Sequence, residues 1–297
     1  MGSSYTIVVD STVDIPAKLA DELKIIVIPY IFMLDGEEYY NHLDYRDLPI
    51  KDFYDALRNG MTATTTQVTA YRYMETWEPF LQDGKDILYM CLSSGLSRSY
   101  DQSMIAAREA MEAYPGRKVI TIDSRSASLG QGALAYYAAK ARDEGKTLEE
   151  NASYIKELIP RLHHWIAPDD LNHLRRGGRV SATSAFVGNM LNIKPIITIS
   201  TDGKMLPVSK VRGAGKVIEH ILGRMTEFEM SPADQTVFIA HSDSHDAAKR
   251  LANAINAKFG IKEFITGEIG PVIGAHTGPG TVAAVFLGNK RVRSMDE

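Results

Sequence analysis

One histidine, His276, stands in the glycine- and proline-rich stretch GPVIGAHTGPG, residues Gly270–Gly280. Near neutral pH an imidazole can donate or accept a hydrogen bond, act as a base or bind a metal. Glycine lets the backbone come very close to a facing group, because it carries no side chain. His276 therefore either faces a ligand or is a packing residue, and the rest of the chain has to distinguish the two.

Serine and threonine hydroxyls gather in two other stretches. The sequence LSSGLSRSY places Ser93, Ser94 and Gly95 directly after an apolar run, where a strand-to-helix turn is expected. The backbone N–H groups of such a turn, and the positive end of the helix dipole, favour an anion. The stretch TATTTQVT, residues 62–69, is dense in threonine just before a predicted helix. Its threonines serve either as a helix N-cap or as contacts to a ligand.

Arg179 supplies a cationic partner for such an anion. It follows two glycines in LRRGGRVSATSA, and arginine beside serine-rich turns is a common way of holding carboxylates and phosphates. The alternative is a solvated basic turn. A serine hydrolase or esterase is the second functional interpretation, with Ser93 as the nucleophile and His276 as its base. Because Ser93 lacks a surrounding Gly-x-Ser-x-Gly pattern and no acid is evident to orient the histidine, we favour anion binding.

Spacing arguments disfavour nucleotide and metal sites. The stretch GPGTVA at Gly278 has dinucleotide-type glycine spacing but is not followed by the helix and strand of a Rossmann unit. The stretch GAGKV at Gly213 lacks the first glycine of a P-loop. His241 and His245 are four residues apart, but a strand end and a turn are expected between them rather than one helix face. We therefore expect no metal and no cofactor.

Composition limits the partners and the compartment. The chain has 297 residues, of which 44% are hydrophobic, and a formal net charge of −4, which gives no reason to expect nucleic acid. No apolar stretch approaches the roughly 18 residues needed to cross a bilayer, so we expect at most transient membrane contact. The single cysteine, Cys91, excludes an internal disulfide and is typical of a reducing cytoplasm.

The first half of the chain alternates expected strands with expected helices. The strands are expected at residues 5–9, 24–32, 86–92 and 118–122. The helices are expected at residues 45–58, 70–81, 97–114 and 129–144. This alternation predicts an α/β fold with a parallel, doubly wound, Rossmann-like sheet. Because ligands bind at the carboxyl ends of such strands, the hydroxyl-rich segments Asp10–Thr12, Ser93–Ser97 and Asp123–Ser126 are expected to meet there.

The second half has a different pattern, which predicts a smaller α+β domain. A helix with capping-box spacing at Thr147 and Glu150 is expected to run to about His163. We place the domain division there, between residues 1–163 and 164–297, with the ligand between the two domains. Two β-rich runs joined at residues 201–203 predict a hairpin. The remaining expected elements are helices at 214–228 and 246–259 and strands at 236–240, 263–269 and 281–288.

Taken in order, seven motifs resemble those of the DegV family, whose characterised members include the fatty-acid-binding subunits of bacterial fatty acid kinase. The motifs are VDSTVDIP, TTTQ, LSSGLSRSYDQS, IDSRSASLGQG, LRRGGRVS, NIKPIITISTDGKM and GPVIGAHTGPG, and they cover nearly the whole chain. The resemblance implies two α/β domains that enclose one fatty acid. It also implies that the acyl chain is buried and that the carboxylate lies in a hydrogen-bonded pocket.

The resemblance further implies which residues bind the ligand. They are Thr65, Ser93, Ser94, Gly95, Arg179 and His276. Among the serine-turn residues, Ser93 is expected to contact the carboxylate directly, and a protonated His276 is expected to donate to it. Arg212 resembles an arginine associated with the kinase step, so Arg212 and His276 are expected to assist phosphoryl transfer.

Three positions depart from the family pattern: Thr66 stands for serine, Val68 for proline and Arg98 for glycine. The departures bear on head-group geometry and on partner docking. The function implied is that of a carrier, not of an enzyme by itself. It holds a long-chain fatty acid and presents the carboxylate to a separate ATP-dependent kinase, which forms an acyl phosphate. We expect a cytoplasmic bacterial monomer that docks on the kinase subunit; a lipid-dependent sensor or scaffold is a third interpretation.

Overall fold

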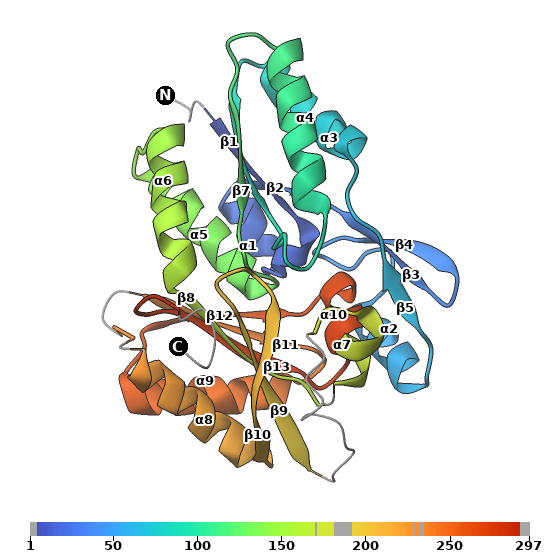
Figure 1. Ribbon diagram of the computed structural model, residues 1–297, viewed down its shortest axis with the longest axis vertical. Helices are drawn as coiled ribbons and strands as arrows, with labels where there is room; N and C mark the ends of the chain where they lie inside the picture. Colours follow the sequence, from blue (N-terminus) through green and yellow to red (C-terminus); the bar gives the residue numbers. More distant parts are fainter. Residues whose placement is uncertain (1–4, 170, 181–191, 229, 232–234, 292–297) are drawn as a thin grey trace.

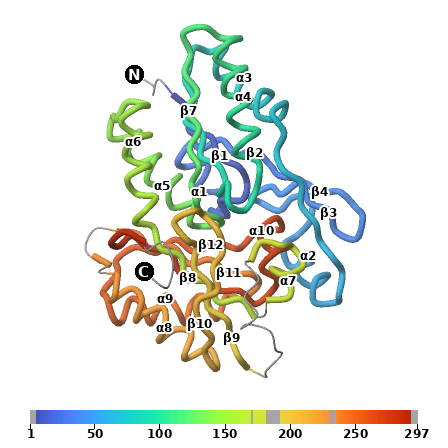
Figure 2. Tube along the Cα trace, in the orientation of Figure 1, coloured from blue at the N-terminus to red at the C-terminus, as the bar shows by residue number. Residues whose placement is uncertain are grey.

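The computed structural model describes residues 5–169, 171–180, 192–228, 230–231 and 235–291. Its strands form a parallel sheet of four strands, an antiparallel sheet of three and a mixed sheet of six. Figure 1 shows the four-stranded sheet with its helices in the upper half of the view and the six-stranded sheet in the lower half. Figure 2 traces the same path along the chain.

The four-stranded sheet confirms the doubly wound pattern. Its strand order is β2-β1-β6-β7, and every neighbouring pair is parallel. The strands are β1 (Tyr5–Asp10), β2 (Ile25–Ile28), β6 (Asp86–Cys91) and β7 (Val119–Asp123). The accompanying helices are α1 (Ala17–Glu22), α3 (Ala70–Gln82), α4 (Ser99–Ala113), α5 (Leu129–Asp143) and α6 (Leu148–Leu158). Helix α6 begins with the predicted capping box of Thr147 and Glu150.

Prolines explain where the first half differs from the sequence expectation. The single strand expected over residues 24–32 is wrong, because Pro29, which cannot donate to a strand ladder, separates β2 from β3. The second sheet consists of β3 (Tyr30–Leu34), β4 (Glu37–Asn41) and β5 (Ala63–Thr65). Helix α2 (Ile50–Arg58) begins directly after Pro49 and not near Tyr45. A proline disfavours helical dihedrals in the residue before it, so the helix does not extend back through position 48.

The six-stranded sheet has the order β10-β9-β8-β13-β11-β12. Its strands are β8 (Leu162–Ala167), β9 (Ile193–Ile199), β10 (Met205–Arg212), β11 (Thr236–His241), β12 (Glu263–Glu268) and β13 (Val282–Leu287). β11 and β12 pair in parallel and the other neighbours are antiparallel, including the predicted hairpin of β9 and β10. Helices α8 (Ala214–Glu227) and α9 (His245–Phe259) cover one face of this sheet (Figure 1).

Helix α6 ends at Leu158, so the expectation that it runs to about His163 is wrong. Pro160 lacks the N–H that would continue the helix, and a short 3₁₀ turn leads into β8 instead. The proposed division between residues 163 and 164 therefore falls inside β8, which belongs to the six-stranded sheet.

Two short helices differ from the sequence expectation. Helix α7 (Asn172–Gly177) precedes Arg179, where a basic turn was expected, and α10 (Pro271–Thr277) replaces the expected glycine-rich loop. The start of α10 is capped from the N-terminal half of the chain. The amide of Gly270 donates to Asp14 at 2.9 Å, and the amide of Val272 donates to Asn41 at 3.3 Å.

Helix α5 lies between the two large sheets. It contacts β1 and β6 on one side and β8, β11 and β13 on the other, and most of its side chains are buried. Its sequence, LGQGALAYYAAKARD, is rich in glycine and alanine, so both sheets approach its backbone closely. A Cβ atom at Gly130 would overlap the imidazole of His164, which is buried in β8. The spacing between the two sheets therefore depends on the small residues of α5.

We expect Gly130→Ala to lower the free energy of unfolding by about 1–3 kcal/mol, because the added methyl group overpacks the contact between α5 and β8. The same substitution should cost less in a His164→Ala background, since the smaller side chain leaves room for the methyl group. Urea unfolding followed by circular dichroism measures both effects.

Gly223→Ala in α8 is the matched control, because nothing lies within 4 Å of a Cβ atom there. Alanine is the better helix former, so this variant should be neutral or slightly stabilising. Equal destabilisation at Gly130 and Gly223, or no effect of the His164→Ala background, would show that α5 is not closely packed.

Candidate functional site

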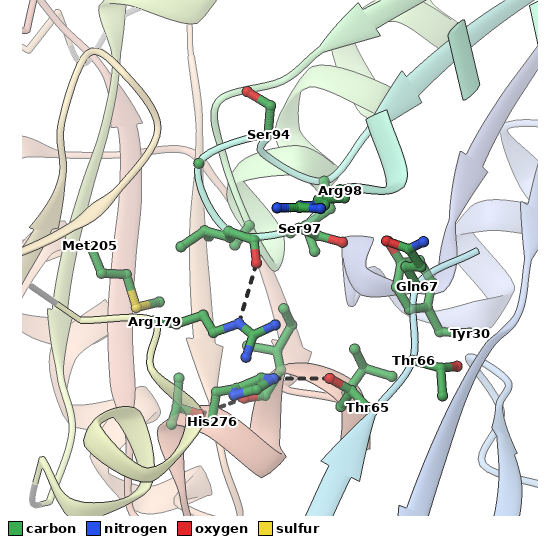
Figure 3. A pocket seen from close by; sticks show the side chains of 17 residues that line it. Tyr30, Thr65, Thr66, Gln67, Ser94, Ser97, Arg98, Arg179, Met205 and His276 are labelled. Carbon is green, nitrogen blue, oxygen red and sulfur yellow. Dashed lines mark hydrogen bonds between the residues drawn. The ribbon is translucent and has the colours of Figure 1, made fainter. Parts of the chain in front are cut away.

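A cavity of about 480 Å³, a volume typical of ligand pockets, lies at the junction of the three sheets. Its apolar lining consists of Leu92, Leu96, Ala127, Met205, Val272 and Ile273. Its other lining residues are Tyr30, Thr65, Thr66, Gln67, Ser94, Gly95, Ser97, Arg98, Arg179, His276 and Thr277. Figure 3 shows the side chains that surround it. An apolar wall that faces several hydrogen-bonding groups suits an amphipathic ligand.

Both halves of the chain build this cavity. The first half contributes the start of β3, the end of β5 and the turns after β6 and β7. The second half contributes the segment after α7, the first residue of β10 and part of α10. The carboxyl ends of β6 and β7 thus lead into the cavity, as they do at ligand sites of other open parallel sheets.

His276 and Thr65 form a polar contact in the wall of the cavity. The Nε2 atom of His276 lies 3.1 Å from Oγ1 of Thr65, as Figure 3 shows. Helix α7 packs directly against the imidazole, because a Cβ atom at Gly177 would overlap its Nδ1 atom. That Nδ1 atom is buried and has no hydrogen-bond partner among the described residues. Among the described residues, the imidazole therefore makes a hydrogen bond through Nε2 and none through Nδ1.

The charge expected for His276 is not the one that the structure supports. Burial, and then the positive charge of Arg179, lower the pKa of His276 to about 4. Its imidazole is therefore neutral at neutral pH in the ligand-free protein, and the expected protonated histidine is wrong for that state. A neutral imidazole still donates one N–H, so it retains the capacity to bind an anion.

Arg179 lies beside this contact. Its Nε atom donates to the carbonyl of Leu96 at 3.3 Å, and its guanidinium lines the cavity next to His276 (Figure 3). Gly178 ends α7 in the left-handed conformation, with a φ of 67°, and so directs the following chain toward the cavity. The structure thus brings Thr65, Arg179 and His276 together.

The structure places the serine turn differently from the sequence expectation. Ser93 is fully buried and is not among the residues that line the cavity. Its hydroxyl donates to the carbonyl of Gly203 at 2.7 Å, and a Cβ atom at Gly95 would lie 2.7 Å from the same carbonyl oxygen. Ser94 lines the cavity, but its hydroxyl donates to Asp123 and points away (Figure 3). Ser93 therefore ties the turn to the β9–β10 hairpin, and the expected direct contact with a ligand does not fit this position.

Arg212 also lies away from the cavity. It is an exposed residue at the end of β10, whereas Met205 at the start of the same strand lines the cavity. At about 3.3 Å per residue, the strand separates these two residues by about 23 Å. Arg212 is not among the residues that line the cavity with His276, and the expected part of both residues in phosphoryl transfer with a kinase stays a prediction.

Sequence reasoning passed over Tyr30 and Met205, which also line the cavity, and it named Ser97 only as part of a hydroxyl-rich segment. Tyr30 donates to Ser99 at 2.6 Å, and the hydroxyls of Ser97 and Ser99 lie 3.0 Å apart. Ser97 belongs to the hydroxyl-rich turn that the sequence singled out, so its type and place were a usable signal. For Met205 no such signal exists, because only the pairing of β10 with β9 brings it to the cavity.

The departures from the family motifs have separate structural settings. Thr66 and Arg98 line the cavity, so both can change how a head group is held. Val68 is buried, and its amide donates to Ser99 at 3.2 Å. A proline at position 68 would have no N–H for this bond.

Other chemistry that the sequence raised is not assembled here. Ser93 donates to Gly203 and the Nε2 atom of His276 faces Thr65, so the structure does not form a serine–histidine pair from Ser93 and His276. Among the described residues, no three His, Cys, Asp or Glu side chains are grouped to hold a metal. Within the same part of the chain, every helix is too short or too polar to cross a bilayer.

In the ligand-free protein, the His276 imidazole should remain neutral down to about pH 5, because its pKa is about 4. The physical reason is that burial disfavours the charged imidazolium and so moves the titration midpoint below that of an exposed histidine. Two-dimensional NMR of 15N-histidine-labelled protein measures the midpoint, and His276→Gln assigns the resonance. A midpoint at the ordinary value of 6.5 would be incompatible with the buried position.

Comparison with known proteins agrees with the family resemblance that the motifs indicated. A family model described as "Uncharacterised protein, DegV family" matches residues 4–289. A DegV domain-containing protein of Clostridium perfringens is 38% identical over 287 residues, which cover 97% of this chain and 98% of the relative.

Two solved structures are similar along almost their whole length. The DegV lipid-binding protein of Thermotoga maritima is 26% identical with a TM-score of 0.86, and the match covers 97% of this chain and 100% of that one. The fatty-acid-binding DegV family protein of Thermus thermophilus is 28% identical with a TM-score of 0.86, and the match covers 96% and 99%. Motif order, fold and coverage therefore agree, and this chain belongs to the DegV family.

Proposed function

We propose that this protein binds one long-chain fatty acid in the 480 Å³ cavity. Its carboxylate lies at Thr65, Arg179 and His276, and its hydrocarbon chain lies against the apolar wall. The observation that carries the proposal is the 3.1 Å contact of His276 Nε2 with Thr65 Oγ1, beside a guanidinium, in the wall of a partly apolar cavity. The similar lipid-binding and fatty-acid-binding DegV proteins support this class of ligand.

The energetics of such a ligand fit the cavity. Each buried methylene contributes about 0.8 kcal/mol, so a chain of sixteen carbons gains on the order of 10 kcal/mol before the costs of association. Removing an ionised carboxylate from water costs several kcal/mol unless it is paired and hydrogen-bonded. The Thr65 hydroxyl, the neutral His276 N–H and the Arg179 guanidinium offset that cost. The hydrocarbon chain thus supplies affinity, and the polar group fixes the orientation.

We further propose that the bound carboxylate is presented to a separate ATP-dependent kinase. A carboxylate oxygen attacks the γ-phosphorus of ATP held by the kinase, and the bond from that phosphorus to the β–γ bridging oxygen breaks. Acyl phosphate and ADP are the products. The absence of a complete P-loop or dinucleotide motif in the sequence supports placing the ATP on the partner.

Denaturing extraction of the purified protein, followed by mass spectrometry of the extract, tests the ligand assignment. We expect about one fatty acid per chain, either retained from expression or taken up after incubation with C14 to C18 acids. An empty extract in both experiments would overturn the carrier function. Labelling of Ser93 by a fluorophosphonate would instead favour the hydrolase.

The substitution Thr65→Val removes a hydroxyl and preserves the shape of the side chain. It should weaken fatty-acid binding about ten-fold, the usual consequence of losing a hydrogen bond to a charged group. Displacement of a fluorescent fatty acid measures the affinity. Ser94→Ala is the matched control, because Ser94 lines the same cavity while its hydroxyl bonds Asp123, and its affinity should stay within about two-fold. Similar losses in the two variants would show that the carboxylate is not held at Thr65.

A further inference from the structure

A second cavity of about 260 Å³ adjoins the first and shares Thr65, Arg179 and His276 with it. Its other lining residues are Leu57, Met61, Thr62, Ala63, Thr64, His173, Arg176, Gly177 and Ala275. The polar contact that we assign to the carboxylate is thus a wall common to two cavities. A ligand held at this wall has space on both sides of its head group.

The second cavity is cationic. Arg176, on α7, lines it together with Arg179, and none of its lining residues is Asp or Glu. The Nη2 atom of Arg176 lies 3.1 Å from Nδ1 of His173, so a histidine nitrogen accepts from one edge of this guanidinium and orients it. Thr62 and Thr64 add hydroxyl groups to the same lining. Two arginines and several hydroxyls make a site for an oxyanion.

A carboxylate alone does not account for this arrangement. Its two oxygens and single charge are matched by the groups on the common wall, which leaves Arg176 without a role in holding it. A phosphate group carries up to two charges and three terminal oxygens, and guanidinium groups bind such oxygens in pairs. Arg176 therefore lies in the cavity into which a phosphate attached to the carboxylate would extend.

We propose that the second cavity binds the phosphate group of a phosphorylated acyl chain, with Arg176 and Arg179 as its cationic contacts. The inference rests on the proposed function, because it takes the hydrocarbon chain to lie in the first cavity. The carboxyl carbon remains at Thr65 and His276, and the phosphate lies on the far side of them. Arg176 then discriminates between a fatty acid and its phosphorylated form.

Hexadecyl phosphate, which is stable in water, is a suitable probe, with hexadecanoate as its unphosphorylated counterpart. Displacement of a fluorescent fatty acid from the full-length protein measures both affinities. We expect Arg176→Met to weaken hexadecyl phosphate about ten-fold and to change hexadecanoate by less than about two-fold. Arg175→Met is the control, because Arg175 is the exposed neighbour of Arg176 on α7 and lines neither cavity. It should not change the ratio of the two affinities.

A second readout follows the charge of the bound phosphate. The 31P resonance of bound hexadecyl phosphate should titrate at a lower pH in the wild-type protein than in Arg176→Met, because a nearby cation favours the dianion. The inference would be overturned if Arg176→Met changed the affinities for both ligands equally, or if the 31P midpoint were identical in the two proteins. Neither result would contradict the proposed binding of a fatty acid. Failure of hexadecanoate to bind wild-type protein would overturn the proposed function itself.

Discussion

The close packing of α5 between the two large sheets is the constraint on which the rest of the structure depends. The helix can be shared because glycine and alanine dominate its sequence, so each sheet reaches its backbone. Thr65 lies in the first half of the chain and His276 in the second. Their side chains are 3.1 Å apart, so this contact requires the two halves to keep a fixed spacing. Any side chain that widened the contact at Gly130 would also separate the two sides of the ligand site.

Buried contacts between the halves transmit this spacing to the polar residues. Asp14 and Asn41 cap α10, the helix that carries His276, and Ser93 bonds Gly203 in the β9–β10 hairpin. Burial raises the pKa of Asp14 to about 8, so this carboxyl is largely protonated near neutral pH. The side chain that caps the helix of His276 is thus mostly uncharged, and Arg98 and Arg179 line the cavity.

Local patterns predicted the parts of the fold that depend on local physics. Alternating apolar strands and amphipathic helices predicted the parallel sheet, and the Thr147–Glu150 capping box and the β9–β10 hairpin were found where expected. Pro29 and Pro160 were local signals for the end of a strand and the end of a helix. The strand expected over residues 24–32 and the helix expected to reach about His163 both ran through these prolines. Helix α10 was not predictable in this way, because its cap at Asp14 lies 256 residues away in sequence. The position of Ser93 and the neutral state of His276 likewise follow from contacts and burial that only the folded chain creates.

A crystal structure of the protein loaded with a C16 fatty acid tests the central claim most directly. The account predicts carboxylate oxygens within hydrogen-bonding distance of Thr65 Oγ1 and His276 Nε2, with the guanidinium of Arg179 beside them and the hydrocarbon chain along the apolar wall. A carboxylate bound instead at the Ser93–Ser94 turn, with the Thr65–His276 contact unchanged, would contradict it.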